Sequence, residues 1–309
     1  MDFGKVENLN EVDFTLPDDH PDTEKLLKSK KKSKKKPEVY VGCAKWGIKE
    51  WVGKLYPLKT KEKDFRTNYL TQFNCIELNP THYRIPSPTQ VKEWKADAEK
   101  DFKFCPKFYQ GISHFARLKN CEKLTEVFYN SIKNFDKNLG ICFLQMPPNY
   151  PPKNFSDLEK YLKILPKKPE VCLELRHKEW FADMKVADEL YDMLKKNKIG
   201  FVITDAAGRR DVIHMRLSTP TAFIRFVGNS LHPTDYIRID DWALRIKKWL
   251  GSGIETVYFI MHMHDERNSP ELCAYTVKQI NKHCGLNLKA PNLFNEEEQK
   301  SISQYGNKI

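Results

Sequence analysis

Eight short runs of β-branched and aromatic residues recur along the chain, with segments of helical periodicity between most of them. The runs cover residues 39–43, 75–79, 102–108, 140–146, 171–176, 200–205, 222–227 and 256–263. Helical periodicity marks residues 91–99, 124–134, 155–165, 186–196, 241–250 and 270–284. Successive runs begin 22 to 38 residues apart, about the length of one strand, one helix and two loops. The spacing predicts an α/β fold, a TIM-barrel-like (β/α)8 single domain over residues 39–288, close to the ~250 residues typical of such barrels.

An open, doubly wound sheet is the main alternative to the barrel. That fold binds dinucleotides through a glycine-rich turn after its first strand, and no such turn follows any of the eight runs. The chain also contains no Walker loop and no G-x-S-x-G motif. The sequence therefore disfavours ATP, NAD and serine-esterase chemistry, and we expect no cofactor.

The charge of the chain is unevenly distributed. The 309 residues carry a net charge of +11. Residues 1–24 hold one lysine and eight acids (net −7), residues 25–37 hold eight lysines and no acid (net +8), and residues 38–309 keep +10. We expect residues 1–38 to form a disordered tail, acidic and then lysine-rich, because such a block has little to bury. It could be a solubilising extension, a nuclear address or a nucleic-acid patch. Residues 289–309 are expected to form a C-terminal extension.

The chain shows no sign of membrane insertion or secretion. Its apolar runs are strand-sized, far below the ~20 residues of a spanning helix, and residues 1–24 are too acidic and polar for a signal peptide. None of the eight cysteines are spaced as C-x-x-C, and most lie in apolar runs, which predicts buried, reduced thiols. We expect a cytoplasmic protein.

Side-chain alternation within the runs predicts what faces the barrel interior. Glu77 and Asn79 share one face of their run, and Glu174 and Arg176 share the corresponding face of another. These polar faces are expected to point inward, with their last members at the C-terminal mouth where barrel enzymes keep their sites. By the same alternation, four further residues are expected near the mouth: Lys107, Gln145, Asp205 and Arg225.

Several motifs of this chain resemble those of a known family. They are GCAKWG at 42–47, IELNPTHYRIP at 76–86, FKFCPK at 102–107, FLQMPP at 143–148 and LELRHKEW at 173–180. In sequence and order they are similar to the YecE-like proteins, the family known as domain of unknown function 72, over residues 39–285. The resemblance implies a TIM-barrel-like fold but no chemistry, because the family is biochemically uncharacterised.

The chain departs from the family pattern at three strand ends. Ala44 and Lys45 replace a serine and a glycine, RFVG at 225–228 replaces a motif with a histidine, and HMHD at 262–265 stands where an asparagine pair is common. A site role for that asparagine pair is therefore in doubt here.

The candidate site residues fall into three groups. The candidate catalytic residues are Glu77, Glu174, Asp205 and His177, because two carboxylates whose pKa values are pushed apart can serve as acid and base. The candidate substrate-binding residues are Asn79, Tyr83, Arg84, Lys107, Gln145, Arg176, Trp180 and Arg225. His262 and His264 form an H-x-H pair that could ligate a divalent metal, but a hydrogen-bonding role is the favoured interpretation, so we expect no metal.

Three hypotheses about function follow. The leading one is a hydrolase or lyase that uses Glu77 and Glu174 on a small anionic, phosphorylated or sugar-like ligand. The second is a nucleic-acid-binding or nucleic-acid-processing protein, favoured by the basic domain and the aromatic residues that follow the strands. The third is a non-catalytic ligand-binding barrel whose charged interior is structural.

Overall fold

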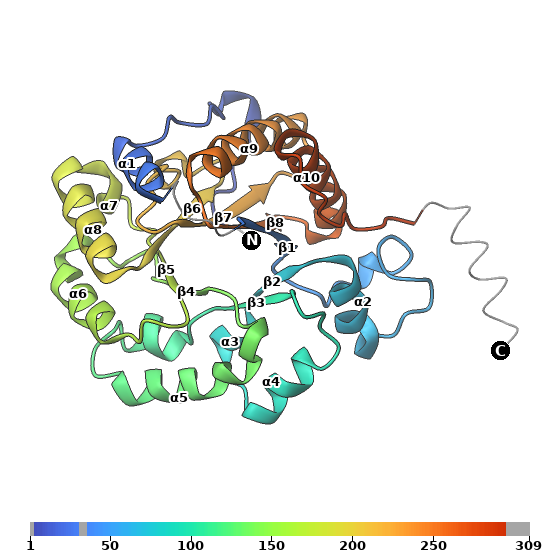
Figure 1. Cartoon of the computed structure of the whole chain (residues 1–309), viewed down its shortest axis with the longest axis horizontal. Coiled ribbons are helices and arrows are strands. Elements are labelled where there is room, and N and C mark those ends of the chain that lie inside the picture. Colours follow the sequence, from blue (N-terminus) through green and yellow to red (C-terminus); the bar gives the residue numbers. More distant parts are fainter. Residues whose placement is uncertain (1–2, 31–35, 295–309) are drawn as a thin grey trace, which may run out of the picture.

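Eight parallel β-strands form the centre of the molecule, and helices surround them (Figure 1). The computed structural model describes residues 3–30 and 36–294. The strands are β1 (Glu38–Cys43), β2 (Cys75–Leu78), β3 (Lys103–Pro106), β4 (Cys142–Gln145), β5 (Val171–Glu174), β6 (Gly200–Asp205), β7 (Thr221–Gly228) and β8 (Thr256–Met263). Their order, β3-β2-β1-β8-β7-β6-β5-β4, places β1 beside β8 and every other strand beside its neighbour in sequence. The predicted TIM-barrel-like fold is confirmed.

The barrel is nearly closed between β3 and β4. Two isolated bridges join these edges, Phe104 with Leu139 and Lys107 with Phe143. The amide of Phe108 also donates a hydrogen bond to the carbonyl of Phe143 (3.0 Å). These contacts hold Lys107, just beyond the end of β3, beside β4.

Ten α-helices occur in the described part of the chain. They are α1 (Pro21–Lys30), α2 (Phe65–Gln72), α3 (Pro80–Tyr83), α4 (Pro88–Lys95), α5 (Glu122–Ile132), α6 (Phe155–Ile164), α7 (Glu179–Ala182), α8 (Met184–Asn197), α9 (Pro233–Ser252) and α10 (Ser269–Cys284). All six predicted helices are present, although α9 begins well before residue 241, at a proline that suits a first helical turn. The four-residue helices α3 and α7 are too short to show periodicity in sequence. None of these helices is both long enough and apolar enough to cross a membrane.

Side chains along the strands separate into two apolar layers, as the alternation predicts. Outward-facing residues such as Ile76 and Leu78 belong to the large core between strands and helices. A smaller cluster fills the barrel and consists of Tyr40, Ala44, Cys75, Cys105, Ile141, Phe143, Cys172, Val202, Phe223, Tyr258 and Ile260. The rings of Phe143 and Phe223 stack inside it with their centroids 5.3 Å apart. This cluster forms an apolar floor beneath the polar residues of the mouth.

The cysteines are reduced, as the sequence predicts. All eight are free thiols, and seven of them are buried. Burial raises the pKa of the Cys75, Cys105 and Cys172 thiols, which keeps them protonated and unreactive.

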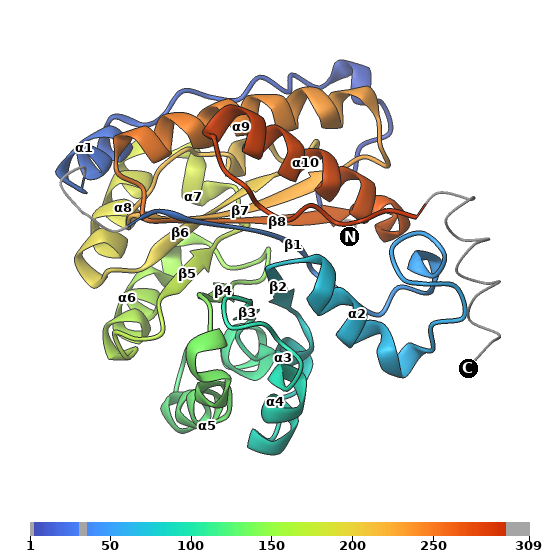
Figure 2. The same ribbon diagram turned by 45° about the vertical axis from the view of Figure 1, so that its right-hand side comes forward.

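The structure differs from the expected tail over residues 3–30, which lie on the barrel instead of in solvent. In Figure 2 this segment follows the length of α9 and ends in α1. Thr23 and Leu27 are buried, and the Asp19 carboxylate pairs with Arg245 and Lys248. The acids of this segment find partners on the basic barrel, which the composition of the segment alone does not reveal. Residues 1–2 and 31–35 of the predicted tail, and 295–309 of the predicted extension, lie outside the described residues.

Candidate active site at the barrel mouth

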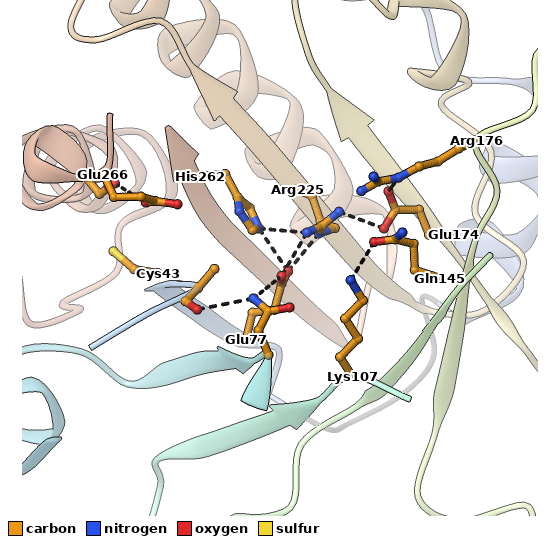
Figure 3. A network of polar contacts seen from close by, with 12 residues as sticks. Cys43, Glu77, Lys107, Gln145, Glu174, Arg176, Arg225, His262 and Glu266 are labelled. Carbon is orange, nitrogen blue, oxygen red and sulfur yellow. Dashed lines mark hydrogen bonds and ion pairs between the residues drawn. The ribbon is translucent and has the colours of Figure 1, made fainter. Parts of the chain in front are cut away.

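Arg225 on β7 is the centre of a buried ionic network at the C-terminal mouth (Figure 3). Its guanidinium donates two hydrogen bonds to Glu77, from Nε (2.8 Å) and Nη2 (2.9 Å), and a third from Nη1 to Glu174 (2.8 Å). The three side chains are at most 2% exposed, and the Arg225 guanidinium lies 5.5 Å from the centroid of the Phe143 ring. One guanidinium thus joins carboxylates from opposite sides of the barrel. The sequence prediction that β2, β5 and β7 bring these groups together is confirmed.

The Glu77 carboxylate is surrounded by protein partners. Oε1 accepts from Arg225 and from the Asn79 amide (3.0 Å), while Oε2 accepts from Arg225 and lies 3.1 Å from His262 Nε2. A carboxylate has about four lone-pair sites; Arg225 and Asn79 occupy three of them, and His262 occupies the fourth when its Nε2 carries the proton. Burial acts to raise the Glu77 pKa, but Arg225 and then His262 outweigh burial and hold the pKa well below its usual range. Glu77 is therefore ionised and committed to the network.

Glu174 keeps part of its hydrogen-bonding capacity. Its Oε1 accepts from Arg176 Nε (2.8 Å) and its Oε2 from Arg225, so its contacts with the described residues use two of about four lone-pair sites. Burial favours a higher pKa, yet the cations Arg176, Arg225 and Lys107 lower the pKa of Glu174 below its ordinary value. Both carboxyl pKa values thus move down together instead of apart. The pair alone does not supply both an acid and a base at neutral pH, which differs from the sequence-based hypothesis.

Arg176 is the least satisfied cation of the network. Its side chain is 10% exposed and reaches Glu174 through Nε. Its Nη2 is buried and has no hydrogen-bond acceptor among the described residues. A buried guanidinium N–H without an acceptor is unfavourable, and an anionic ligand is a group that would satisfy it.

Lys107 is a cation of the network whose pKa is lowered toward neutral pH. Its Nζ donates to the Gln145 side-chain oxygen (2.8 Å), and the residue is 9% exposed. Burial, together with the neighbouring Arg225, lowers the pKa of Lys107 to about 8, although Glu77 and Glu174 act in the opposite direction. An amine with this pKa can donate a proton at neutral pH.

His262 joins the network through hydrogen bonds. Its Nε2 lies 3.1 Å from Arg225 Nη2 and 3.1 Å from Glu77 Oε2, so it either accepts from the guanidinium or donates to the carboxylate. His264 lies just beyond the end of β8. Over residues 3–30 and 36–294, no three His, Cys, Asp or Glu side chains are grouped as a metal ion would require.

Asp205 lies apart from this network, contrary to its predicted grouping with Glu77 and Glu174. Val202 belongs to the barrel interior, so the strand period places Thr204 on the inward face and Asp205 on the outward one. The Asp205 carboxylate accepts hydrogen bonds from Trp242 Nε1 (2.8 Å) and Arg210, and lies 3.5 Å from Arg238 Nε. Despite burial, these arginines hold the pKa of Asp205 below its usual value. The end of β6 thus lies one residue out of the register expected from the sequence.

Replacing Asp205 with asparagine is expected to lower the free energy of unfolding by about 1.5–3 kcal/mol, because two arginines lose their anion while Trp242 keeps an acceptor. Urea denaturation measures this loss. Asp157→Asn, which breaks a surface pair with Lys119, is the control and should change stability by less than about 1 kcal/mol. A destabilisation of Asp205→Asn no larger than that of the control contradicts the structural role of Asp205.

The remaining predicted site residues lie on the rim or in the core. His177 Nδ1 accepts a bond from the Glu179 amide (3.4 Å) and makes no contact with the network. Trp180 is fully buried, and its indole donates to the Tyr150 carbonyl (2.6 Å), which makes it a packing residue. Tyr83 and Arg84 are exposed and line a cavity of about 490 Å³ together with Ala44, Lys45, Trp46, Gly47, Ile76, Leu78, Asn79 and Pro80.

Two histidines beside the mouth were not among the predicted site residues. The imidazoles of His82 and His114 lie 4.9 Å apart, and His82 Nδ1 lies 2.8 Å from the Phe108 carbonyl. Burial and the nearby Lys107 lower the pKa of each to about 4, so both are neutral at physiological pH. The sequence indicates a place near the mouth for His82 only because this residue follows the end of β2. His114 lies in a π-helical turn (Gly111–Phe115) that no periodicity revealed.

Fold and site together define a (β/α)8 barrel whose C-terminal mouth holds a buried network of carboxylates and cations. The sequence matches the family model described as "Protein of unknown function DUF72" over residues 40–294, and the chain belongs to this family. The resemblance stated from the motifs is thereby confirmed.

Relatives of this chain share its fold without revealing its chemistry. It is 28% identical over 252 residues to the UPF0759 protein YecE of Escherichia coli K12, which covers 76% of this chain and 89% of that protein. A crystal structure of a DUF72 family protein from Enterococcus faecalis V583 matches with a TM-score of 0.62 and 17% identity, covering 81% of this chain and 99% of the other. Another from Thermotoga maritima MSB8 matches with a TM-score of 0.59 and 20% identity, covering 81% and 100%.

Proposed function

We propose that the protein is an enzyme, a hydrolase or lyase, that acts on a small anionic or sugar-like substrate at the C-terminal mouth of the barrel. The observation that carries this proposal is Arg176, whose buried Nη2 has no acceptor among the described residues. An anionic group of the substrate, a phosphate or a carboxylate, would accept a charge-assisted hydrogen bond there.

Two neighbours of Arg176 have the properties of proton-transfer groups. Glu174 is ionised and keeps lone pairs, which suits a general base. Lys107, with a pKa of about 8, suits a general acid. Glu77 accepts three hydrogen bonds from Arg225 and Asn79 and also contacts His262, so we assign it a positioning role: it fixes Arg225, which in turn orients Glu174.

The cavity beside Asn79 supports the sugar-like character of the proposed substrate. It is lined mainly by apolar atoms, with the Trp46 and Tyr83 rings among its walls. Aromatic rings pack well against the apolar faces of sugars.

Binding of inorganic phosphate, measured by isothermal titration calorimetry, tests the anion site. Arg176→Met is expected to weaken phosphate binding at least about tenfold, because one charge-assisted hydrogen bond is lost. Arg117→Met is the matched control, since both terminal nitrogens of Arg117 already donate to Asn149 on the same rim. Failure of phosphate to bind, or equal affinity in Arg176→Met and wild type, overturns the proposal.

A nucleic-acid ligand is the second candidate. Tyr83 and Phe115 are two large aromatic residues near His82. Their side chains are 68% and 72% exposed and could stack on bases. The net charge of residues 38–309 is +10. This candidate differs from the first in requiring an affinity that falls steeply as salt concentration rises.

A further inference from the structure

The N-terminal segment of the described chain crosses the rim of the barrel mouth. The ring of Phe3 lies over the Arg176 guanidinium, with 4.1 Å between the ring centroid and Cζ, and 5.0 Å from Cζ of Arg209. Arg176 is the residue to which the proposed function assigns the substrate anion. Phe3, which lies outside the barrel in sequence, thus covers one face of the Arg176 guanidinium.

The segment is held most firmly far from the mouth. Asp19 is 1% exposed and accepts hydrogen bonds from Arg245 (2.7 Å) and the Trp249 indole (3.0 Å). Thr23 is buried, donates to the Met215 carbonyl (2.9 Å) and accepts from the Leu217 amide (2.9 Å). These contacts anchor the segment to α9 and to the chain between β6 and β7.

The contacts weaken toward the mouth. In the middle of the segment, Arg210 Nη2 donates to the carbonyls of Phe14 (3.3 Å) and Thr15 (3.4 Å). Both distances are long for a hydrogen bond. At its beginning, Gly4 accepts one backbone hydrogen bond from Gly208 (2.8 Å) and Phe3 is only partly buried. Segments with few buried contacts open at a low free-energy cost while firmly packed ones stay closed.

The packing of Phe3 and Gly4 against the loop after β6 requires a glycine at position 4. Gly4 has φ +75°, and a Cβ added there would lie 2.6 Å from the Ala206 Cβ. A side chain at position 4 would therefore be strained by the backbone and would clash with the loop after β6.

We propose that residues 3–20 form a strap whose tip, Phe3 and Gly4, closes the mouth over Arg176 and lifts to admit ligand. That the strap guards a ligand site rests on the proposed function. The family model matches residues 40–294, and the strap precedes that range. The proposed control element is therefore an addition to the barrel that defines the family.

Chemical modification of Arg176 by phenylglyoxal, followed by peptide mass spectrometry on the full-length protein, tests the strap. Phe3→Ala and Gly4→Val should each speed modification of Arg176 about tenfold, the factor expected when one cation–π contact of typical strength is lost. Both variants keep the anchor at Asp19 and Thr23, so the fold is retained. Lys5→Ala, an exposed change in the same segment, should behave as wild type, and Arg117 serves as an internal standard whose rate stays constant.

Inorganic phosphate separates the two proposals in the same experiment. Phosphate bound at Arg176 should slow its modification in wild type and in Phe3→Ala. Acceleration in both tip variants without protection by phosphate supports the strap and overturns the anion site. Unchanged modification rates in Phe3→Ala and Gly4→Val overturn the strap, whatever phosphate does.

Discussion

Replacing Arg225 with methionine is expected to lower the free energy of unfolding by about 3–5 kcal/mol at neutral pH, the range observed when one partner is removed from a buried ion pair. Arg225 is 1% exposed and forms ion pairs with both Glu77 and Glu174. Without it, two buried carboxylates remain with few compensating cations. Arg267→Met, which breaks a pair with Asp265 at a site where Arg267 is 58% exposed, should cost less than about 1 kcal/mol.

The Arg225→Met variant should gain stability as pH falls through the neutral range, where the contribution of Glu77 to the wild-type protein does not change. In wild type the folded-state pKa of Glu77 lies below its usual value, so its stabilising contribution is present above the unfolded pKa and is lost as pH falls through the folded pKa. In the variant, burial without Arg225 raises the Glu77 pKa, and the folded state binds protons more readily than the unfolded state. The stability of the variant therefore rises as pH falls from about 7.5 to 5.5.

Urea denaturation of both proteins across this range measures the effect. A variant that does not fold at neutral pH should fold on acidification, so the test holds in either case. Parallel pH profiles of wild type and Arg225→Met would contradict the assignment of Arg225 as the counter-ion of both carboxylates.

Strand alternation predicted most of the network because it depends only on the two-residue period of a strand. Glu77, Lys107, Gln145, Glu174 and Arg225 all lie at the mouth as expected. Asp205 is the exception, because the end of β6 is not marked in the sequence and a shift by one residue moves a side chain to the other face. The pairing of Val202 with Phe223 on β7 determines that Thr204, and not Asp205, faces the barrel interior. This pairing is a long-range contact.

The strap could not be predicted from composition, because its partners lie about 200 residues away in sequence. The composition of residues 1–24 predicts a solvated acidic tail, because composition alone does not show the basic surface that residues 3–24 contact. The acidic segment and the basic barrel are complementary, and a few apolar residues, among them Leu27 and Phe14, complete the contact. Likewise, the contacts of Glu77 come from three residues, Arg225 on β7, His262 on β8 and Asn79 just after β2, and no local pattern reveals them together.

Replacing Glu174 with glutamine or Lys107 with methionine is expected to lower kcat/KM by about 10²–10⁴, the usual contribution of a positioned acid or base. The substrate is to be found by screening the wild-type protein against phosphorylated sugars and sugar acids with mass-spectrometric detection. Glu170→Gln is the matched control, because Glu170 precedes the same strand at the opposite end of the barrel and should leave turnover unchanged. Since Glu174 and Lys107 act on one transition state, the double variant should be little worse than either single variant.

The pH profile distinguishes a proton donor from a residue that merely packs at the mouth. Glu174 stays ionised throughout the neutral range because its pKa is lowered, whereas Lys107 loses its proton as pH rises past about 8. Wild-type kcat/KM should therefore be level through neutral pH and fall above about 8, and the residual activity of Lys107→Met should lack that fall. A screened substrate that Glu174→Gln and Lys107→Met turn over at wild-type rates would exclude both residues from the chemistry and leave the network a structural one. An alkaline fall that persists in Lys107→Met would instead assign the proton donor to another group of the mouth.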